Sequence, residues 1–135
     1  MLKIIVPVRA ISFIVPGKPE GWRATQGKWC KLSKQVMVWN AKVRVAAAEA
    51  GLECPLFVSR EDPMCIVTCA VYPTWTFSDP QNVSKALIDA LFWVDPKKKK
   101  EIAVKGQGDK YVCGVWYLNI VNKENPHTKV WCWRK

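Results

Sequence analysis

The sequence predicts one α/β (α+β) domain over residues 1–135, in which a mixed β-sheet packs against two main helices. The chain has 135 residues, 50% of them hydrophobic, which suits a single domain with its own core. Two segments repeat apolar residues at helical spacing, and several others are short β-branched runs bounded by turn residues. These segments follow the order strand, helix, strand, helix, strand, strand, which favours helices packed on a mixed sheet.

The first half of the chain predicts a strand, a loop and a long helix. Residues 4–8 (IIVPV) and 11–15 (ISFIV) form one strand or two and lead into the proline- and glycine-rich loop at 16–23 (PGKPEGWR). Residues 33–51 then predict an amphipathic helix of about 16 to 18 residues, capped by Ser33 and closed by Gly51. Its buried stripe comprises Leu32, Val36, Trp39, Val43 and Ala47.

The second half predicts a second helix among strands. Residues 64–72 (MCIVTCAVY) lie between two prolines and are typical of a central strand. A helix runs from Pro80 to about Trp93, and EIAVK (101–105) and YVCGVWYLNIV (111–121) form two strands joined by the hairpin loop GQGDK. The buried stripe of this helix comprises Val83, Leu87, Ala90, Leu91 and Val94.

The charge of the chain points to an anionic partner. Twenty-one basic and eleven acidic residues give a formal net charge of +10, which indicates either a polyanion partner such as DNA or simply a solvated surface. No basic amphipathic helix and no apolar run of about 20 residues occurs, so a membrane is the least favoured partner. Pro7 and Arg9 interrupt the apolar N-terminal segment, and we expect a cytoplasmic protein, in a bacterial or phage-infected cell.

The cysteines and tryptophans predict packing more than chemistry. The six cysteines are expected to be reduced, with Cys65 and Cys69 on one face of their strand as packing residues. A zinc site with His127 has little support because no Cys-x-x-Cys pair exists. Trp131 and Trp133 share one face of a C-terminal strand, where they form a dimer contact, a base-stacking surface or simple packing; we favour packing or a dimer contact.

Two aspartates border the second helix in FSDPQNVSKALIDALFWVDPKKKK (77–100). Asp79 precedes a proline and suits the N-cap position, which is its ordinary structural role. Asp95 follows the helix, and a turn there would bring it back toward Asp79, beside Lys85. Two converging carboxylates make an oxygen-rich site suited to Mg²⁺, and a lysine can hold the scissile phosphate of a nucleic acid as a point charge.

Further basic residues are candidates for contact with the DNA backbone. A run of lysines often forms a solvated loop, but beside a phosphate-cleaving site contact with DNA is the better interpretation. The candidates are Lys97, Lys98, Lys99 and Lys100 after the helix, and Lys18 and Arg23 in the early loop.

The segment resembles the RusA family of Holliday junction resolvases. That family carries Asp-x-Asp-Asn-x-x-Lys at the start of a helix, and this chain reads Asp79-Pro80-Gln81-Asn82-Val83-Ser84-Lys85. An Asp-Asp pair follows the family's helix, where this chain has Asp95-Pro96. The likeness spans about residues 11–122 and is specific over 77–105.

The resemblance implies a homodimeric nuclease that binds branched DNA, the four-way junction, and resolves it by paired symmetric nicks in DNA recombination and repair. Such crossover junction endodeoxyribonucleases are frequent in phage and use Mg²⁺, with Mn²⁺ as a possible substitute. Asp79 matches a metal carboxylate, Asn82 the family's asparagine and Lys85 its catalytic lysine. Gln81 and Pro96 replace family acids, so the implied metal ligands are Asp79, Asp95 and the neutral carbonyl oxygen of Gln81.

Three functions remain open at this point. The first is an active resolvase, which uses Asp79, Lys85 and Asp95. The second is a binding module of the same fold that holds junctions without cutting them, because Gln81 and Pro96 remove negative charge from the metal site. The third is a general polyanion binder, which requires only the charge and the aromatic residues.

Overall fold

The computed structural model describes residues 6–21, 34–76, 80–93 and 111–135. These residues form a mixed α+β fold with a four-stranded sheet and two helices, which confirms the predicted class. The elements are β1 (Ile11–Pro16), α1 (Lys34–Glu49), β2 (Met64–Tyr72), α2 (Pro80–Leu91), β3 (Val112–Val121) and β4 (His127–Arg134).

The sheet has the strand order β1-β4-β2-β3, so the last strand of the chain lies in its interior. β4 pairs antiparallel with both β1 and β2, for example through the pairs of Cys132 with Ile11 and of Cys132 with Ile66. β2 and β3 are parallel, which makes the sheet mixed as predicted. β2 covers the predicted residues, and β4 contains Trp131 and Trp133, which were predicted to lie on a C-terminal strand.

Two strand predictions are not confirmed: one is wrong over residues 6–10, and the other falls outside the described residues. Residues 6–10 are not part of a strand, because Ala10 N donates to Pro7 O at 3.0 Å and closes a turn there. Pro7 itself has no N–H to offer a sheet, so the strand begins only at Ile11. The predicted strand at 101–105 and the loop that follows it lie outside the described residues.

Helix α1 forms and ends as predicted. Val36, Trp39, Val43 and Ala47 are buried. Gly51 has φ +88°, and Leu52 N donates to Ala47 O at 2.9 Å, so a left-handed glycine terminates the helix and satisfies one of its last carbonyls.

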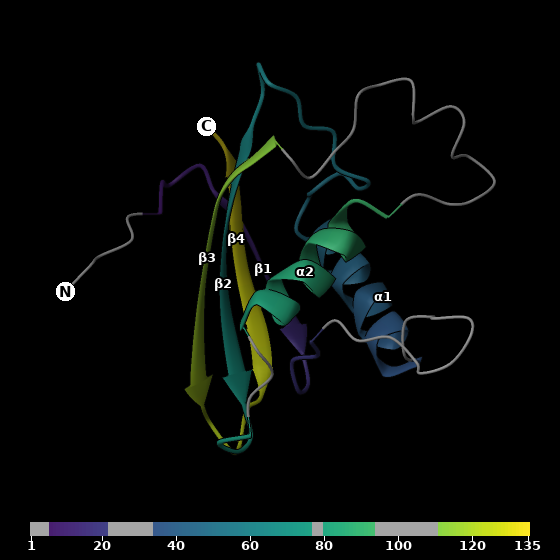
Figure 1. The fold of residues 1–135 in the computed structure, drawn as a ribbon, viewed down its shortest axis with the longest axis vertical. Coiled ribbons are helices and arrows are strands. Elements are labelled where there is room, and N and C mark those ends of the chain that lie inside the picture. The colour runs from purple at the N-terminus through teal and green to yellow at the C-terminus, as the bar shows by residue number, and fades with distance from the viewer. Residues whose placement is uncertain (1–5, 22–33, 77–79, 94–110) are drawn as a thin grey trace.

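Both helices lie on the same face of the sheet (Figure 1). The core is therefore a single layer of side chains between the two helices and the sheet. The helices also contact each other: when the side-chain amide of Asn40 in α1 is oriented to satisfy its neighbours, its nitrogen donates to Ala86 O of α2 at 3.2 Å. Near their other ends, the Arg44 guanidinium lies 4.4 Å from the ring centroid of Trp93. The side chains with no measurable exposure include Val15, Val36, Val43, Ile66, Tyr72, Leu87, Leu91 and Val130.

The described residues also bear on three other predictions. Neither α1 nor α2 has both the length and the apolar composition that crossing a bilayer requires. Cys54, Cys65, Cys69 and Cys132 are in no disulfide, and Cys65 is buried while Cys69 is half-buried. Over the same part of the chain, no group of three His, Cys, Asp or Glu side chains is placed to hold a metal ion.

Candidate nucleic-acid interface

Both helices begin at the end of the molecule at which β1, β2 and β3 finish, the lower end in Figure 1. Two backbone hydrogen bonds tie this end together: Gly17 N donates to Pro126 O at 3.1 Å, and Asn122 N donates to Tyr72 O at 2.8 Å. Neither helix has an acidic residue in its first turn. Because the N-terminus of a helix carries partial positive charge, the first turns of α1 and α2 contribute positive potential at this end of the molecule.

Helix α2 presents two of the predicted site residues to solvent near its start. Asn82 and Lys85 are exposed, whereas Val83 and Leu87 on the opposite side of the helix are buried. The 3.6-residue period of a helix explains this division, since burial of Val83 and Leu87 turns Lys85 outward. The structure thus presents an asparagine and a lysine together on the surface of the first turns of α2.

Two of the three predicted metal ligands, Asp79 and Asp95, lie outside the residues that the structure describes. The backbone of the third, Gln81, belongs to the first turn of α2. Helix α2 spans Pro80–Leu91, which is about 18 Å at ~1.5 Å per residue. Asp79 precedes this helix and Asp95 follows it. For both aspartates to bind one ion, the chain after the helix must therefore run back toward the start of the helix by about its length.

Three lysines surround a cavity of about 330 Å³ at the same end of the molecule. Lys18 follows β1, and Lys34 and Lys42 belong to α1. We call it the lysine cavity; its lining residues are Lys18, Glu20, Lys34, Gln35, Val38, Trp39 and Lys42. The Nζ of Lys42 lies beside Gly17, the residue after β1: it is 3.8 Å from the point that a Cβ atom on Gly17 would occupy. The lysine side chain thus extends from α1 to the end of β1.

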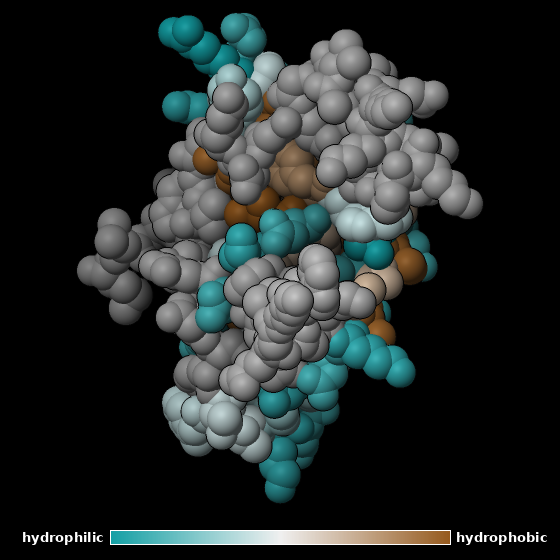
Figure 2. Space-filling view, turned by 45° about the vertical axis from the view of Figure 1, so that its right-hand side comes forward, coloured by the Kyte–Doolittle hydropathy of each residue, from teal (hydrophilic) through white to brown (hydrophobic). Residues whose placement is uncertain are grey.

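Sequence reasoning identified Lys18 in this cavity but not Lys34 or Lys42. The sequence did contain a signal for these two lysines: they lie off the buried stripe of α1, which places them on the solvent side of the helix. Hydrophilic side chains are prominent over this lower end in the view of Figure 2. Arg23 and the four lysines at 97–100, also predicted to contact DNA, lie outside the described residues.

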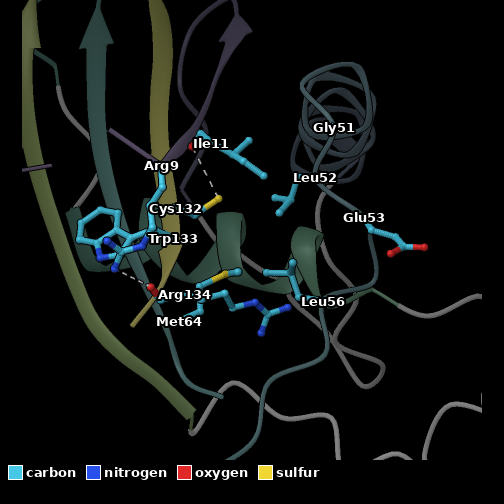
Figure 3. A pocket seen from close by; sticks show the side chains of 10 residues that line it. All are labelled: Arg9, Ile11, Gly51, Leu52, Glu53, Leu56, Met64, Cys132, Trp133 and Arg134. Atoms are coloured by element: carbon cyan, nitrogen blue, oxygen red, sulfur yellow. Dashed lines mark hydrogen bonds between the residues drawn. The ribbon is translucent and has the colours of Figure 1, made fainter. Parts of the chain in front are cut away.

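A second cavity of about 300 Å³ lies where β4 ends and β2 begins (Figure 3). Two arginines line it, but both contact the chain itself. Arg9 Nη2 donates to Arg134 O at 3.0 Å. Arg134 Nη1 donates to Phe57 O at 2.7 Å and lies 3.3 Å from a carboxylate oxygen of Asp62. The Arg134 contacts hold the end of β4 against the 57–62 segment, and the Arg9 contact ties the segment before β1 to the same end of β4, so both arginines have a structural role.

The wall of this second cavity contains a thiol that resists ionisation. Burial raises the pKa of the Cys132 thiol to about 11; the negative charge of an ionised Cys54 adds to the rise, and Arg134 opposes it. The Cys132 Sγ also lies 3.8 Å from Ile11 O, which it contacts as a weak donor. Cys132 is therefore protonated at neutral pH and serves as a packing residue.

This raised pKa predicts a loss of stability at alkaline pH. Between an unfolded value of 9.0 and a folded value of about 11, the folded state retains a proton that the unfolded state has lost. The free energy of unfolding should therefore fall as pH rises through this window, by about 2 to 3 kcal/mol. Urea titrations across the window should show a smaller fall for Cys132→Ala, and equal slopes for the two proteins would contradict the assignment.

No protein-family model matches the chain, and no curated protein matches it either. The resemblance to the RusA family therefore depends on the motif residues themselves.

Proposed function

We propose that the protein is a Mg²⁺-dependent, structure-selective endonuclease that binds four-way DNA junctions and resolves them by paired nicks. The motif from Asp79 to Lys85 is the basis of this proposal. The observation that supports it best is the exposure of Asn82 and Lys85 at the start of α2, at the end of the molecule that also carries the lysine cavity. A DNA backbone lying across this end would meet helix N-termini and ammonium groups together.

Each residue of the proposed site has a distinct part in the chemistry. Lys85 holds the scissile phosphate and offsets the charge that develops on its oxygens, and Asn82 donates a hydrogen bond to the same backbone. Asp79, Asp95 and the carbonyl oxygen of Gln81 are the oxygen ligands that Mg²⁺ prefers. When bound there, the ion would supply an activated water and stabilise the leaving oxygen.

A labelled mobile four-way junction tests this proposal. Incubation of the purified protein with the junction and either Mg²⁺ or Mn²⁺ should give nicks at symmetric positions on two opposing strands. Asp79→Asn should abolish them, because it removes the charge on the principal metal ligand. Failure to nick over a wide range of both metals would reject the proposal.

The second candidate is a junction-binding protein that does not cut. Gln81 and Pro96 favour it, because each stands where the RusA family has an acid, and loss of these charges weakens Mg²⁺ binding. This function predicts preference for the junction over duplex DNA in a gel shift, unchanged in Asp79→Asn and Asp95→Asn. Equal affinity for junction, duplex and single strand would instead indicate a general polyanion binder.

Paired cuts require two active sites, so we also propose a homodimer, and the uncovered face of the sheet fits that role. Both helices lie on the other face, and no described segment forms a layer over this one (Figure 1). Leu118 and Ile120 of β3 are 58% and 41% exposed, and Trp131 and Trp133 are half-buried. The described residues on this open face are Ser12, Ile14, Pro16, Cys65, Val67, Cys69, Val71, Leu118, Ile120, His127, Lys129, Trp131 and Trp133, of which Cys65, Val67 and Val71 are themselves buried.

The chemistry and size of the open face favour a second copy over a nucleic acid. Among its described residues there is no acid and one lysine. The Nζ of Lys129 lies 4.9 Å from the Trp131 ring centroid, so this lysine contacts an aromatic ring of the protein itself. Aromatic residues with few charges are typical of an interface core. Four strands present about 500 Å² in projection. Two such faces together reach about 1,000 Å², the lower limit for a stable interface.

Two substitutions of equal exposure test this interface. Leu118→Glu on the open face should convert a dimer of twice 15.4 kDa to monomers in sedimentation equilibrium. Val45→Glu on α1 should leave the dimer intact, although both original side chains are 58% exposed. Ile120→Lys repeats the test if Leu118→Glu fails to fold. A monomeric unmodified protein, or dissociation by Val45→Glu alone, would contradict the interface.

A further inference from the structure

We propose that the groove between α1 and the free edge of β1 binds an extended segment of a partner protein, which joins the sheet as an added strand next to β1. We call it the edge groove; it has a volume of about 450 Å³, and its walls are residues of β1 and of the solvent side of α1. The inference goes beyond the proposed endonuclease, because it requires no metal ion, no DNA and no dimer.

The free edge of β1 offers main-chain hydrogen-bonding groups to such a segment. Among the described strands, β1 lies at one edge of the sheet and pairs with β4 on its inner side. Gly17 N donates to Pro126 O, so Gly17 and every second residue before it direct their N–H and C=O groups at β4. The N–H and C=O groups of Ser12 and Ile14 therefore point away from β4. An extended chain suits these groups, because it presents acceptors and donors at the same spacing.

Apolar side chains line the edge groove from both sides. Ile14 and Pro16 belong to β1, and Val38, Ala41 and Val45 form one stripe along α1. Ile14, Val38 and Val45 are 52%, 50% and 58% exposed. The sequence of β1, ISFIVP, has no charged residue, although charges are a usual protection of an exposed edge. An added strand would lie against the stripe of α1 and remove this apolar surface from water.

The charged residues of the groove favour one direction for the added strand. Lys42 lies beside Gly17, just after β1, whereas Leu52, just after α1, shares a cavity with Ile11 at the start of β1. α1 therefore runs antiparallel to β1, with Lys42 near the end of β1 and Glu49 nearer its start. A strand antiparallel to β1, which is the more stable pairing, would meet Lys42 first and Glu49 last. The matching segment thus has an acid before its apolar residues and a base about four residues later, since seven helical residues span about 10 Å.

A second copy of the chain fits the edge groove less well than a bare strand does. Its β1 would pair antiparallel with the first β1 around a two-fold axis normal to the sheet, which keeps the helices of both copies on the same face. Because α1 itself forms one wall of the groove, the second α1 would enter space that the first α1 already fills. An extended segment with no helix packed beside it avoids this clash.

Titration with a short peptide tests the inference directly. The probe is acetyl-Glu-Val-Thr-Val-Lys-amide, in which both valines face α1 when the peptide pairs with β1. In a ¹⁵N–¹H spectrum, the amide signals of Ser12 and Ile14 should move saturably, whereas those of Leu118 and Ile120 in β3, at the opposite edge of the sheet, should stay in place. The reversed peptide, acetyl-Lys-Val-Thr-Val-Glu-amide, should bind about three- to tenfold more weakly, because it must place like charges together or pair parallel.

Three substitutions make the test specific. Ser12→Pro removes an N–H that takes no part in the pairing of β1 with β4, so the sheet is retained and the Kd of the peptide should rise about fivefold. Val45→Glu places a carboxylate in the apolar stripe of α1 and should abolish saturable binding. Leu118→Glu, at the opposite edge of the sheet, should leave the Kd within about twofold.

Each result either supports or overturns the inference. Saturable binding that Val45→Glu abolishes and Leu118→Glu retains supports it. No saturable shift at up to about 5 mM peptide, or equal responses at both edges of the sheet, overturns it. Self-association of the unmodified protein that Val45→Glu alone removes would assign the groove to a second copy and also overturn it. Because the titration contains neither DNA nor a metal ion, it can succeed even if the endonuclease proposal fails, and the reverse also holds.

Discussion

Replacing Lys85 by alanine is expected to lower the rate of junction cleavage by about 100- to 1,000-fold, the usual loss when a donor to the developing charge is removed. Junction affinity should change by less than about threefold, because one exposed ammonium group contributes little to binding at physiological salt. Lys85 is exposed near the start of α2, where a backbone phosphate can approach it. Single-turnover cleavage and gel shifts on the same preparation measure the two quantities.

Lys34→Ala is the matched control for this substitution, because it also removes one exposed lysine from the first turns of a helix. It should leave the cleavage rate at saturation unchanged and lower the slope of log Kd against log salt by about one. If Lys85→Ala reduces binding as much as cleavage, Lys85 is part of the basic surface and not of the reacting site.

Leu87→Ala is expected to lower the free energy of unfolding by about 3 kcal/mol. Leu87 has no measurable exposure, and it packs in the core between α2 and the sheet. The shorter side chain leaves a cavity that the surrounding core fills only in part. Since small domains are stable by about 5 to 15 kcal/mol, this loss is a large share of the total. Urea denaturation with an unchanged m-value measures it.

Ile88→Ala is the control for the core substitution. Ile88 is the next residue of α2 and has the same number of carbon atoms, but its side chain is only partly buried. Its replacement should therefore cost about 1 kcal/mol, because less apolar surface returns to water and a smaller void remains. Equal losses for the two variants would contradict the orientation of α2 on the sheet.

Local patterns were sufficient to predict most elements of the fold. The period of Val36, Trp39 and Val43 identified the buried side of α1, and Gly51 marked its end. The β-branched run between two prolines identified β2 to the residue. These signals succeed because hydrophobic periodicity and left-handed glycine are determined within a few residues of the chain.

The position of β4 was not predictable from such patterns. Its alternating tryptophans indicated a strand, but its place between β1 and β2 arises from pairs such as Val130 with Phe13, which are far apart in the sequence. The same limit applies to the lysine cavity. Helical periodicity places Lys42 on the solvent side of α1, but only the packing of α1 against β1 brings it to Lys18.

The central claim is that Asp79 and Asp95 hold one divalent ion beside Lys85. A crystal of the protein soaked with Mn²⁺ tests it most directly, because the anomalous signal locates the ion without reference to activity. We expect one anomalous peak at bonding distance from a carboxylate oxygen of each aspartate, with the Lys85 ammonium group facing the same space. Side chains that point away from each other, with no peak between them, would contradict it.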